Sequence, residues 1–145
     1  MSTVEGIQMT DSLRIVVADD DPLLRALLQL KLEGEGHAVT LAADGDEAMQ
    51  VVTAEPPQLL VLDVVMPGID GLELTRELRK RPDTKELPIV LLTGRDTDPD
   101  IFEGWNSGAN YYITKPFVIE QLRYFIKSMQ DNLEPAEPWD DSPTE

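Results

Sequence analysis

Short apolar runs alternate along this chain with stretches whose apolar positions recur every three or four residues. The short runs predict five strands, at residues 14–18, 38–41, 59–63, 87–93 and 111–114. The run at 59–63, LLVLD, is apolar at four successive positions, as in a parallel strand that is buried on both faces. The intervening stretches have the spacing of amphipathic helices.

Five helices are expected, one after each strand. The first begins at Pro22, which suits the first turn of a helix, and ends at Gly34 and Gly36. Its apolar positions are Leu23, Leu24, Leu27, Leu28 and Leu32. Either Asp44 or Asp46 can cap the second helix.

The third and fourth helices span about 72–80 and 99–107, and the fifth follows Phe117. The apolar face of this last helix comprises Val118, Leu122, Phe125, Ile126 and Met129. Five strand-then-helix units predict an α/β fold, an open doubly wound five-stranded parallel sheet with helices on both faces.

The two ends of the chain differ in composition from the expected domain at 13–132. Residues 1–12 are expected to form a flexible leader. Residues 133–145 carry five acids, three prolines and no base, which predicts a disordered acidic tail. Trp139 is the one residue of this tail that we expect to be able to dock onto another surface.

Composition and charge exclude several classes of protein. The 145 residues include no cysteine, and no apolar stretch approaches the roughly 20 residues that span a bilayer. The leader lacks the basic start and apolar core of an export signal, so we expect a cytoplasmic protein with no membrane contact. The net charge of −16 repels a phosphate backbone, so direct binding of nucleic acid is not expected.

Polar residues stand where the predicted strands end. They are Asp19, Asp20 and Asp21 after the first strand, Asp63 in the third, Thr93 in the fourth and Lys115 after the fifth. Because the carboxyl ends of parallel strands meet at one edge of a sheet, these residues should converge. Carboxylates held together need a compensating cation, and oxygen ligands without histidine or cysteine favour Mg²⁺ or Mn²⁺.

This set of residues suits phosphoryl chemistry. Asp63, at the end of the most apolar strand, can act as a nucleophile that forms an aspartyl phosphate. Thr93 can bond a phosphoryl oxygen, and Lys115 supplies positive charge to the equatorial oxygens. Asp21, beside Pro22, is instead expected to cap the first helix.

Residues 13–132 resemble the receiver domain of two-component response regulators, including the chemotaxis regulators. The resemblance rests on four segments: VVADDDP at 16–22, VLDVVMPGIDG at 61–71, LLTG at 91–94 and YYITKPF at 111–117. It implies a sheet of strand order 2-1-3-4-5. It also implies a phosphoacceptor that receives its phosphoryl group from a histidine kinase or a histidine phosphotransfer protein.

The resemblance assigns a role to each matching residue. Asp63 is implied as the phosphoacceptor. The Mg²⁺ ligands are implied to be Asp20, Asp63 and the backbone carbonyl of Val65, with Asp19 supporting the metal through water or hydrogen bonds. Thr93 and Lys115 match the pair that senses the phosphate, and the Lys115–Pro116 peptide bond is expected to be cis.

Tyr112 matches the aromatic switch of the family, although it can equally be a half-buried aromatic of the strand. Tyr111 should then face the opposite side. If the switch applies, phosphorylation changes the conformation of the surface formed by the helix at 99–107, the strand at 111–114 and the last helix. Downstream proteins, or a second copy of the chain as a homodimer, would bind there.

Two positions near the acidic edge, and one far from it, need separate comment. In this family the side chains at the positions of Val65 and Arg95 flank the path of the water that hydrolyses the aspartyl phosphate, so both residues are expected to alter the phosphoryl lifetime. His37, the only histidine, is expected to be a turn residue far from the acidic edge.

Two alternatives remain open. A phosphatase of the haloacid dehalogenase type would use a similar set of residues, but it needs an aspartate where Val65 stands. The chain can also be the receiver part of a longer regulator with a DNA-binding or cyclase output domain.

Overall fold

This computed structural model describes residues 12–94 and 108–131. The expected tail, all of the leader except Ser12, Arg95 and the helix expected at 99–107 lie outside the described residues. None of the helices in the described part of the chain has the length and apolar character that crossing a membrane requires.

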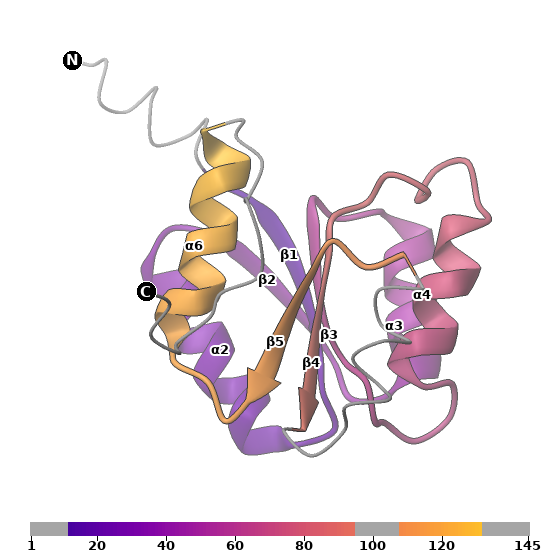
Figure 1. Cartoon of the computed structure of the whole chain (residues 1–145), viewed down its shortest axis with the longest axis horizontal. Coiled ribbons are helices and arrows are strands. Elements are labelled where there is room, and N and C mark those ends of the chain that lie inside the picture. The colour runs from indigo at the N-terminus through magenta and orange to yellow at the C-terminus, as the bar shows by residue number, and fades with distance from the viewer. Residues whose placement is uncertain (1–11, 95–107, 132–145) are drawn as a thin grey trace, which may run out of the picture.

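A parallel sheet of five strands, counted within the described residues, has the order β2-β1-β3-β4-β5 (Figure 1). The strands are β1 Arg14–Ala18, β2 Ala38–Ala42, β3 Leu59–Asp63, β4 Ile89–Gly94 and β5 Tyr111–Lys115. Every residue of β3 is buried, as its continuous apolar run predicts. The expected fold class and the strand order are therefore confirmed.

Aspartates begin three of the helices. The described helices are α2 Pro22–Gly34, α3 Gly45–Ala54, α4 Gly71–Arg79 and α6 Ile119–Gln130. The side chains of Asp21, Asp44 and Asp70 accept hydrogen bonds from backbone N–H groups in the first turns of α2, α3 and α4. These carboxylates satisfy amides that have no partner within the helix. Asp44, rather than Asp46, is thus the cap of α3.

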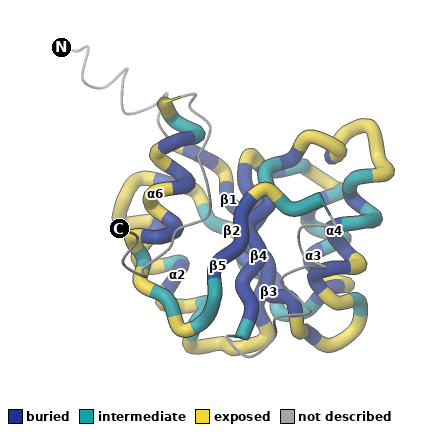
Figure 2. The backbone as a smooth tube through the Cα atoms, viewed as in Figure 1, coloured by how far each residue is buried: buried dark blue, intermediate teal, exposed yellow. Residues whose placement is uncertain are grey.

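Two hydrophobic layers enclose the sheet. Helices α2 and α6 cover one face, and α3 and α4 cover the other (Figure 1). Because side chains alternate along a strand, Ile15 and Val17 pack towards α2 and α6, whereas Val16 and Ala18 pack towards α3 and α4. Figure 2 shows that β1, β3 and β4 are largely buried, whereas the edge strand β2 and the helices carry exposed and intermediate residues.

The helical spacing overestimates how much of each apolar face is buried. Leu28 and Leu32 are buried as expected, but Leu23 and Leu27 are 75% and 47% exposed. Val118 caps α6 rather than lying within it and is 56% exposed. Neighbouring helices of this fold cover only part of each expected apolar face, which the spacing alone does not reveal.

His37 is more than the turn residue expected from the sequence. It follows the turn after α2 and is buried. Its Nδ1 accepts a hydrogen bond of 3.1 Å from the backbone N–H of Leu13. Burial lowers the pKa of the His37 imidazole, and the charge of Glu35 opposes this shift. The neutral ring therefore joins the start of β1 to the start of β2.

We predict that replacing His37 with leucine lowers the free energy of unfolding by about 1–3 kcal/mol near pH 7.5, because the buried Leu13 N–H loses its acceptor. Since the folded-state pKa of His37 is lowered, its contribution is present above the pKa of the unfolded state. It is lost as the pH falls through the folded-state pKa. Urea unfolding should therefore show a smaller difference between the two proteins near pH 5. An equal difference at both pH values would contradict the role of the neutral ring.

Candidate functional site

The carboxyl ends of three strands bring two acids and one base together. Asp19 follows β1, Asp63 ends β3 and Lys115 ends β5. By the alternation of each strand, all three side chains point to the face covered by α2 and α6. The Nζ atom of Lys115 lies 3.1 Å from Oδ2 of Asp19 and 3.0 Å from Oδ2 of Asp63. Residues far apart in sequence thus form one bridged cluster.

Burial makes the charged forms of the two carboxylates in this cluster costly. Asp19 is fully buried and Asp63 nearly so. Burial, and next the charge of Asp19, raise the pKa of Asp63 to about 6, although Lys115 and the Val65 N–H act in the opposite direction. Burial lowers the pKa of Lys115, but its hydrogen bonds and charge interactions with Asp63 and Asp19 outweigh this and raise it. One ammonium group therefore does not fully compensate two buried carboxylates.

The donor set fits a hard divalent cation. Carboxylate oxygens of Asp19, Asp20 and Asp63 all lie within 4.8 Å of one another, and Asp20 is exposed at the rim. Oxygen ligands of this kind suit Mg²⁺, which keeps several waters and therefore needs an open side to its site.

The three successive aspartates separate into two kinds. Asp21 caps α2 through the N–H of Leu23, and its own N–H donates to Oδ1 of Asp19 at 2.9 Å. The carboxylate of Asp19 is thus fixed from the backbone as well as by Lys115. Asp21 holds its neighbour in place without joining the group of oxygens.

Arg25 is a site residue that sequence reasoning missed. Its Nη1 donates to the backbone carbonyl of Asp19 at 2.8 Å. This bond fixes the end of β1 from the first turns of α2. Nothing in the sequence pattern distinguishes Arg25 from an ordinary charged residue on a helix surface.

The loop after β3 contacts Asp63 through its backbone. The N–H of Val65 donates to Oδ1 of Asp63 at 3.4 Å, and the Val65 side chain is 66% exposed. Gly71 donates from its N–H to the carbonyl of Val64 at 2.8 Å. A Cβ atom on Gly71 would lie 2.3 Å from the carbonyl oxygen of Asp63. The chain can therefore approach Asp63 this closely only because residue 71 has no side chain. The metal-ligand role of the Val65 carbonyl stays a prediction.

Thr93 and Tyr112 lie on the other face of the sheet. Thr93 is buried at the end of β4, and Tyr112 is buried among the residues that pack towards α3 and α4. Tyr111 packs on the opposite face and stacks on Phe125 with a centroid distance of 5.0 Å. The opposite orientation of the two tyrosines is confirmed, and Tyr112 is buried rather than half-buried. The Lys115–Pro116 bond is cis, as expected.

The comparison with protein families gives one match that covers most of the chain. The model of the response regulator receiver domain matches residues 15–127. Among curated proteins, the response regulator MprA of Mycobacterium avium (strain 104) is 42% identical over 130 residues, which are 90% of this chain and 55% of that protein. The chain thus spans about half the length of the curated relatives that it matches.

Solved structures agree with this match. A putative response regulator from Chloroflexus aurantiacus is 38% identical, with a TM-score of 0.78 over 83% of this chain and 98% of that one. The receiver domain of the sensor histidine kinase PA1611 from Pseudomonas aeruginosa is 27% identical, with a TM-score of 0.76 and the same two coverages. That structure contains a magnesium ion coordinated in the active site cleft.

We predict that replacing Gly71 with alanine lowers the free energy of unfolding by about 1–3 kcal/mol, because the added methyl group overlaps the backbone of Asp63. The matched control is Gly34 to alanine. A Cβ atom at that helical position has no contact within 4 Å, so stability should change by no more than about 1 kcal/mol. Urea unfolding measures both. Equal effects would show that the close approach at Gly71 is not the cause.

Proposed function

Because the chain belongs to the family of response regulator receiver domains, which act in two-component signalling, we propose that Asp63 is its phosphoacceptor. One observation carries this proposal. Asp63 ends the buried strand β3, and its carboxylate lies 3.0 Å from the ammonium group of Lys115, beside Asp19 and Asp20. A nucleophile, a cation and an acidic pair thus occupy one edge of the sheet.

The proposed donor is a phosphohistidine of a histidine kinase or a histidine phosphotransfer protein. A carboxylate oxygen of Asp63 attacks the phosphorus atom, and the bond between phosphorus and the imidazole nitrogen breaks. The imidazole leaves with the electron pair of that bond, and a proton already on its other ring nitrogen makes the departing ring neutral. Lys115 is placed to stabilise the charge on the equatorial oxygens. Beyond its own phosphorylation and dephosphorylation, the chain is proposed to catalyse no reaction.

Mg²⁺ is proposed as the cofactor. Asp20, Asp63 and the Val65 carbonyl would hold it, with Asp19 supporting it through water or hydrogen bonds. When bound, Mg²⁺ supplies positive charge to the carboxylates and to the oxygens of the transferred group. The fit of the acidic oxygens and the magnesium ion in the related PA1611 receiver support this assignment.

Thr93 and Tyr112 are proposed as the switch that reports phosphorylation. Thr93 stands at the carboxyl end of β4, and Tyr112 pairs in register with Leu91, two residues earlier on that strand. The alternation of the strands places both side chains on the same face. A movement of Thr93 towards the phosphoryl group would therefore free space on the side where Tyr112 packs. The surface of β5 and α6, with the expected helix at 99–107, would then bind a downstream protein or a second copy of the chain.

The comparisons limit what is proposed for the whole protein. Because the chain spans only about half of its curated relatives, the receiver of a longer regulator with an output domain remains the alternative. The reading frame beyond Glu145 tests it. The family match gives no support to a haloacid dehalogenase-type phosphatase, and Val65 stands where that class needs an aspartate. A cytoplasmic location and the absence of nucleic-acid binding stay predictions.

We predict that replacing Asp20 with asparagine raises the Mg²⁺ concentration needed for phosphorylation of Asp63 by at least about tenfold, because a charged ligand is lost. Replacing Asp21 with asparagine should change it little, because asparagine also caps helices well. Intact-mass measurement of the chain with acetyl phosphate and titrated Mg²⁺ detects one added phosphoryl group. Replacing Asp63 with asparagine should abolish the label. A label that survives in that variant would contradict the proposed acceptor.

We predict that replacing Val65 with asparagine shortens the lifetime of the phosphorylated chain severalfold. The exposed isopropyl group beside Asp63 offers no hydrogen bond, whereas a carboxamide can orient the attacking water. The decay of the phosphorylated mass after removal of the donor gives the lifetime. Leu30 to asparagine, an exposed apolar position on α2, is the control and should decay as the unmodified chain does. An unchanged lifetime in the Val65 variant would refute this role.

A further inference from the structure

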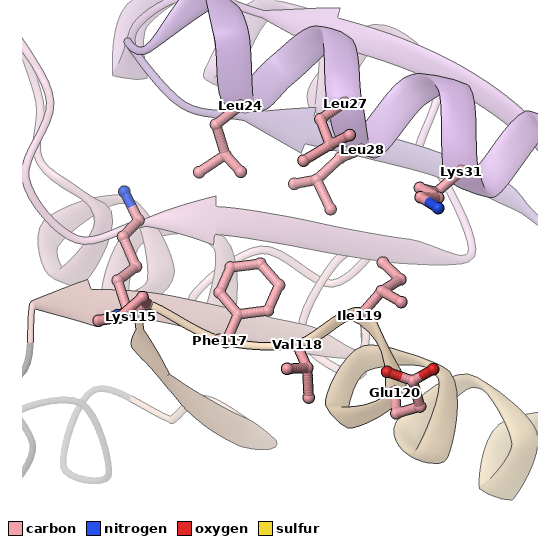
Figure 3. Close-up of a pocket in the computed structure, with 10 residues that line it drawn as sticks. Leu24, Leu27, Leu28, Lys31, Lys115, Phe117, Val118, Ile119 and Glu120 are labelled. Atoms are coloured by element: carbon pink, nitrogen blue, oxygen red, sulfur yellow. The ribbon is translucent and has the colours of Figure 1, made fainter.

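A largely apolar groove runs between α2 and the segment that joins β5 to α6. Its volume is about 640 Å³. Besides Pro116, the apolar side chains that line it are Leu24, Leu27, Leu28, Phe117, Val118 and Ile119. Figure 3 shows Lys115 at one end of this groove, and Lys31 and Glu120 towards the other.

The groove is an extension of the core that the described residues leave open. Leu24, Phe117 and Ile119 pack against the buried cluster beneath α2 and α6. Leu27 and Val118, in contrast, are 47% and 56% exposed at its rim. Apolar side chains that gather in a concave site usually mark a binding surface. An occupant with an apolar group and a partner for Lys31 would complete it.

The chain contains a segment with these two properties. In the acidic tail, residues 137–141 read EPWDD, which place Trp139 directly before two aspartates. Lys31 is exposed and makes no ion pair with any other residue in the described ranges 12–94 and 108–131. We propose that Trp139 docks into the groove between α2 and α6, with Asp140 or Asp141 next to Lys31.

The length of the tail permits this contact. Helix α6 has 12 residues and is therefore about 18 Å long, with the groove at its start and Asp131 at its end. Trp139 follows Asp131 by eight residues, which extend over about 26 Å. The extended length of the tail thus exceeds the length of α6, which is enough for the indole to reach back from Asp131 to the groove.

Tethering makes even a weak contact effective. A short linker gives the tail a local concentration on the order of millimolar at the groove. A buried tryptophan covers roughly 150–250 Å² of apolar surface, and no other aromatic residue occurs in the tail. Pro135 and Pro138 also reduce the number of conformations that the free tail loses on docking.

Docking would place the tail beside the acidic edge, because Lys115 belongs both to the groove and to the cluster around Asp63. A protein that approaches Asp63 along α2 would then have to displace Trp139. This consequence rests on the function proposed above, whereas the docking itself does not.

The test follows Trp139 fluorescence in the full chain. Trp105, the only other tryptophan, is replaced with phenylalanine. Emission should lie to the blue of the same chain in urea, and quenching by acrylamide should be weaker. Leu27 to aspartate should shift both values to those of the chain in urea. Leu30 to aspartate is the matched control, because Leu30 is exposed on the same helix but does not line the groove, and it should change neither value.

Reversing the charge of Lys31 tests the proposed ion pair with Asp140 or Asp141. Lys31 to glutamate should increase quenching at low salt, and high salt should reduce this difference. Lys85 to glutamate makes the same change of net charge at another exposed lysine and should have no effect. If the Trp105 variant does not fold, nuclear Overhauser effects between the Trp139 ring and the methyl groups of Leu27 and Val118 are measured in the unmodified chain.

Several results would overturn the proposal. Trp139 could be as accessible to acrylamide in the folded chain as in urea. Trp139 could be protected from acrylamide but unaffected by the Leu27 substitution, which would place the indole outside the groove. Protection that depends on protein concentration would identify a second copy as the occupant. Absence of the nuclear Overhauser effects would likewise reject docking in the groove.

Discussion

Two carboxylates buried beside a single ammonium group are the constraint on which this structure depends. Asp19 and Asp63 are removed from water at the ends of β1 and β3, and Lys115 bridges them from β5. A buried charge is costly unless it is paired, and here the pairing is incomplete, as the raised pKa of Asp63 shows. The cluster is therefore arranged to accept further positive charge, and the open rim at Asp20 gives a cation access to it.

The parallel sheet brings the site residues to one edge and also separates them onto its two faces. Alternation along the strands directs Asp19, Asp63 and Lys115 to the side of α2 and α6, and Thr93 and Tyr112 to the side of α3 and α4. The acidic cluster and the residues proposed to respond to it thus belong to different layers of the core. The switch proposed for Thr93 and Tyr112 would therefore have to act across the sheet, through the carboxyl end of β4.

Short segments serve both the site and the surfaces around it. The end of β5 carries Lys115 into the cluster, and two residues later Phe117 lines the apolar groove. At the start of α2, Asp21 fixes the carboxylate of Asp19 while Arg25 fixes its carbonyl. A group that binds beside α2 would therefore contact the same segments that hold the acidic residues. The same short segments of chain therefore carry residues of the acidic cluster and residues of the groove beside it.

The sequence by itself determined the five strands, the four helices that the structure describes and the residues at the strand ends, because apolar periodicity and helix caps are local properties. The continuous run of β3 and the capping aspartates show this most directly. Only the tertiary structure decided that Leu23 and Leu27 are exposed, that His37 binds Leu13 and that Gly71 lies against Asp63. Periodicity identifies the apolar side of a helix but not how much of it a neighbour covers. Contacts between distant segments depend on the order of the strands, which spacing along the chain does not encode.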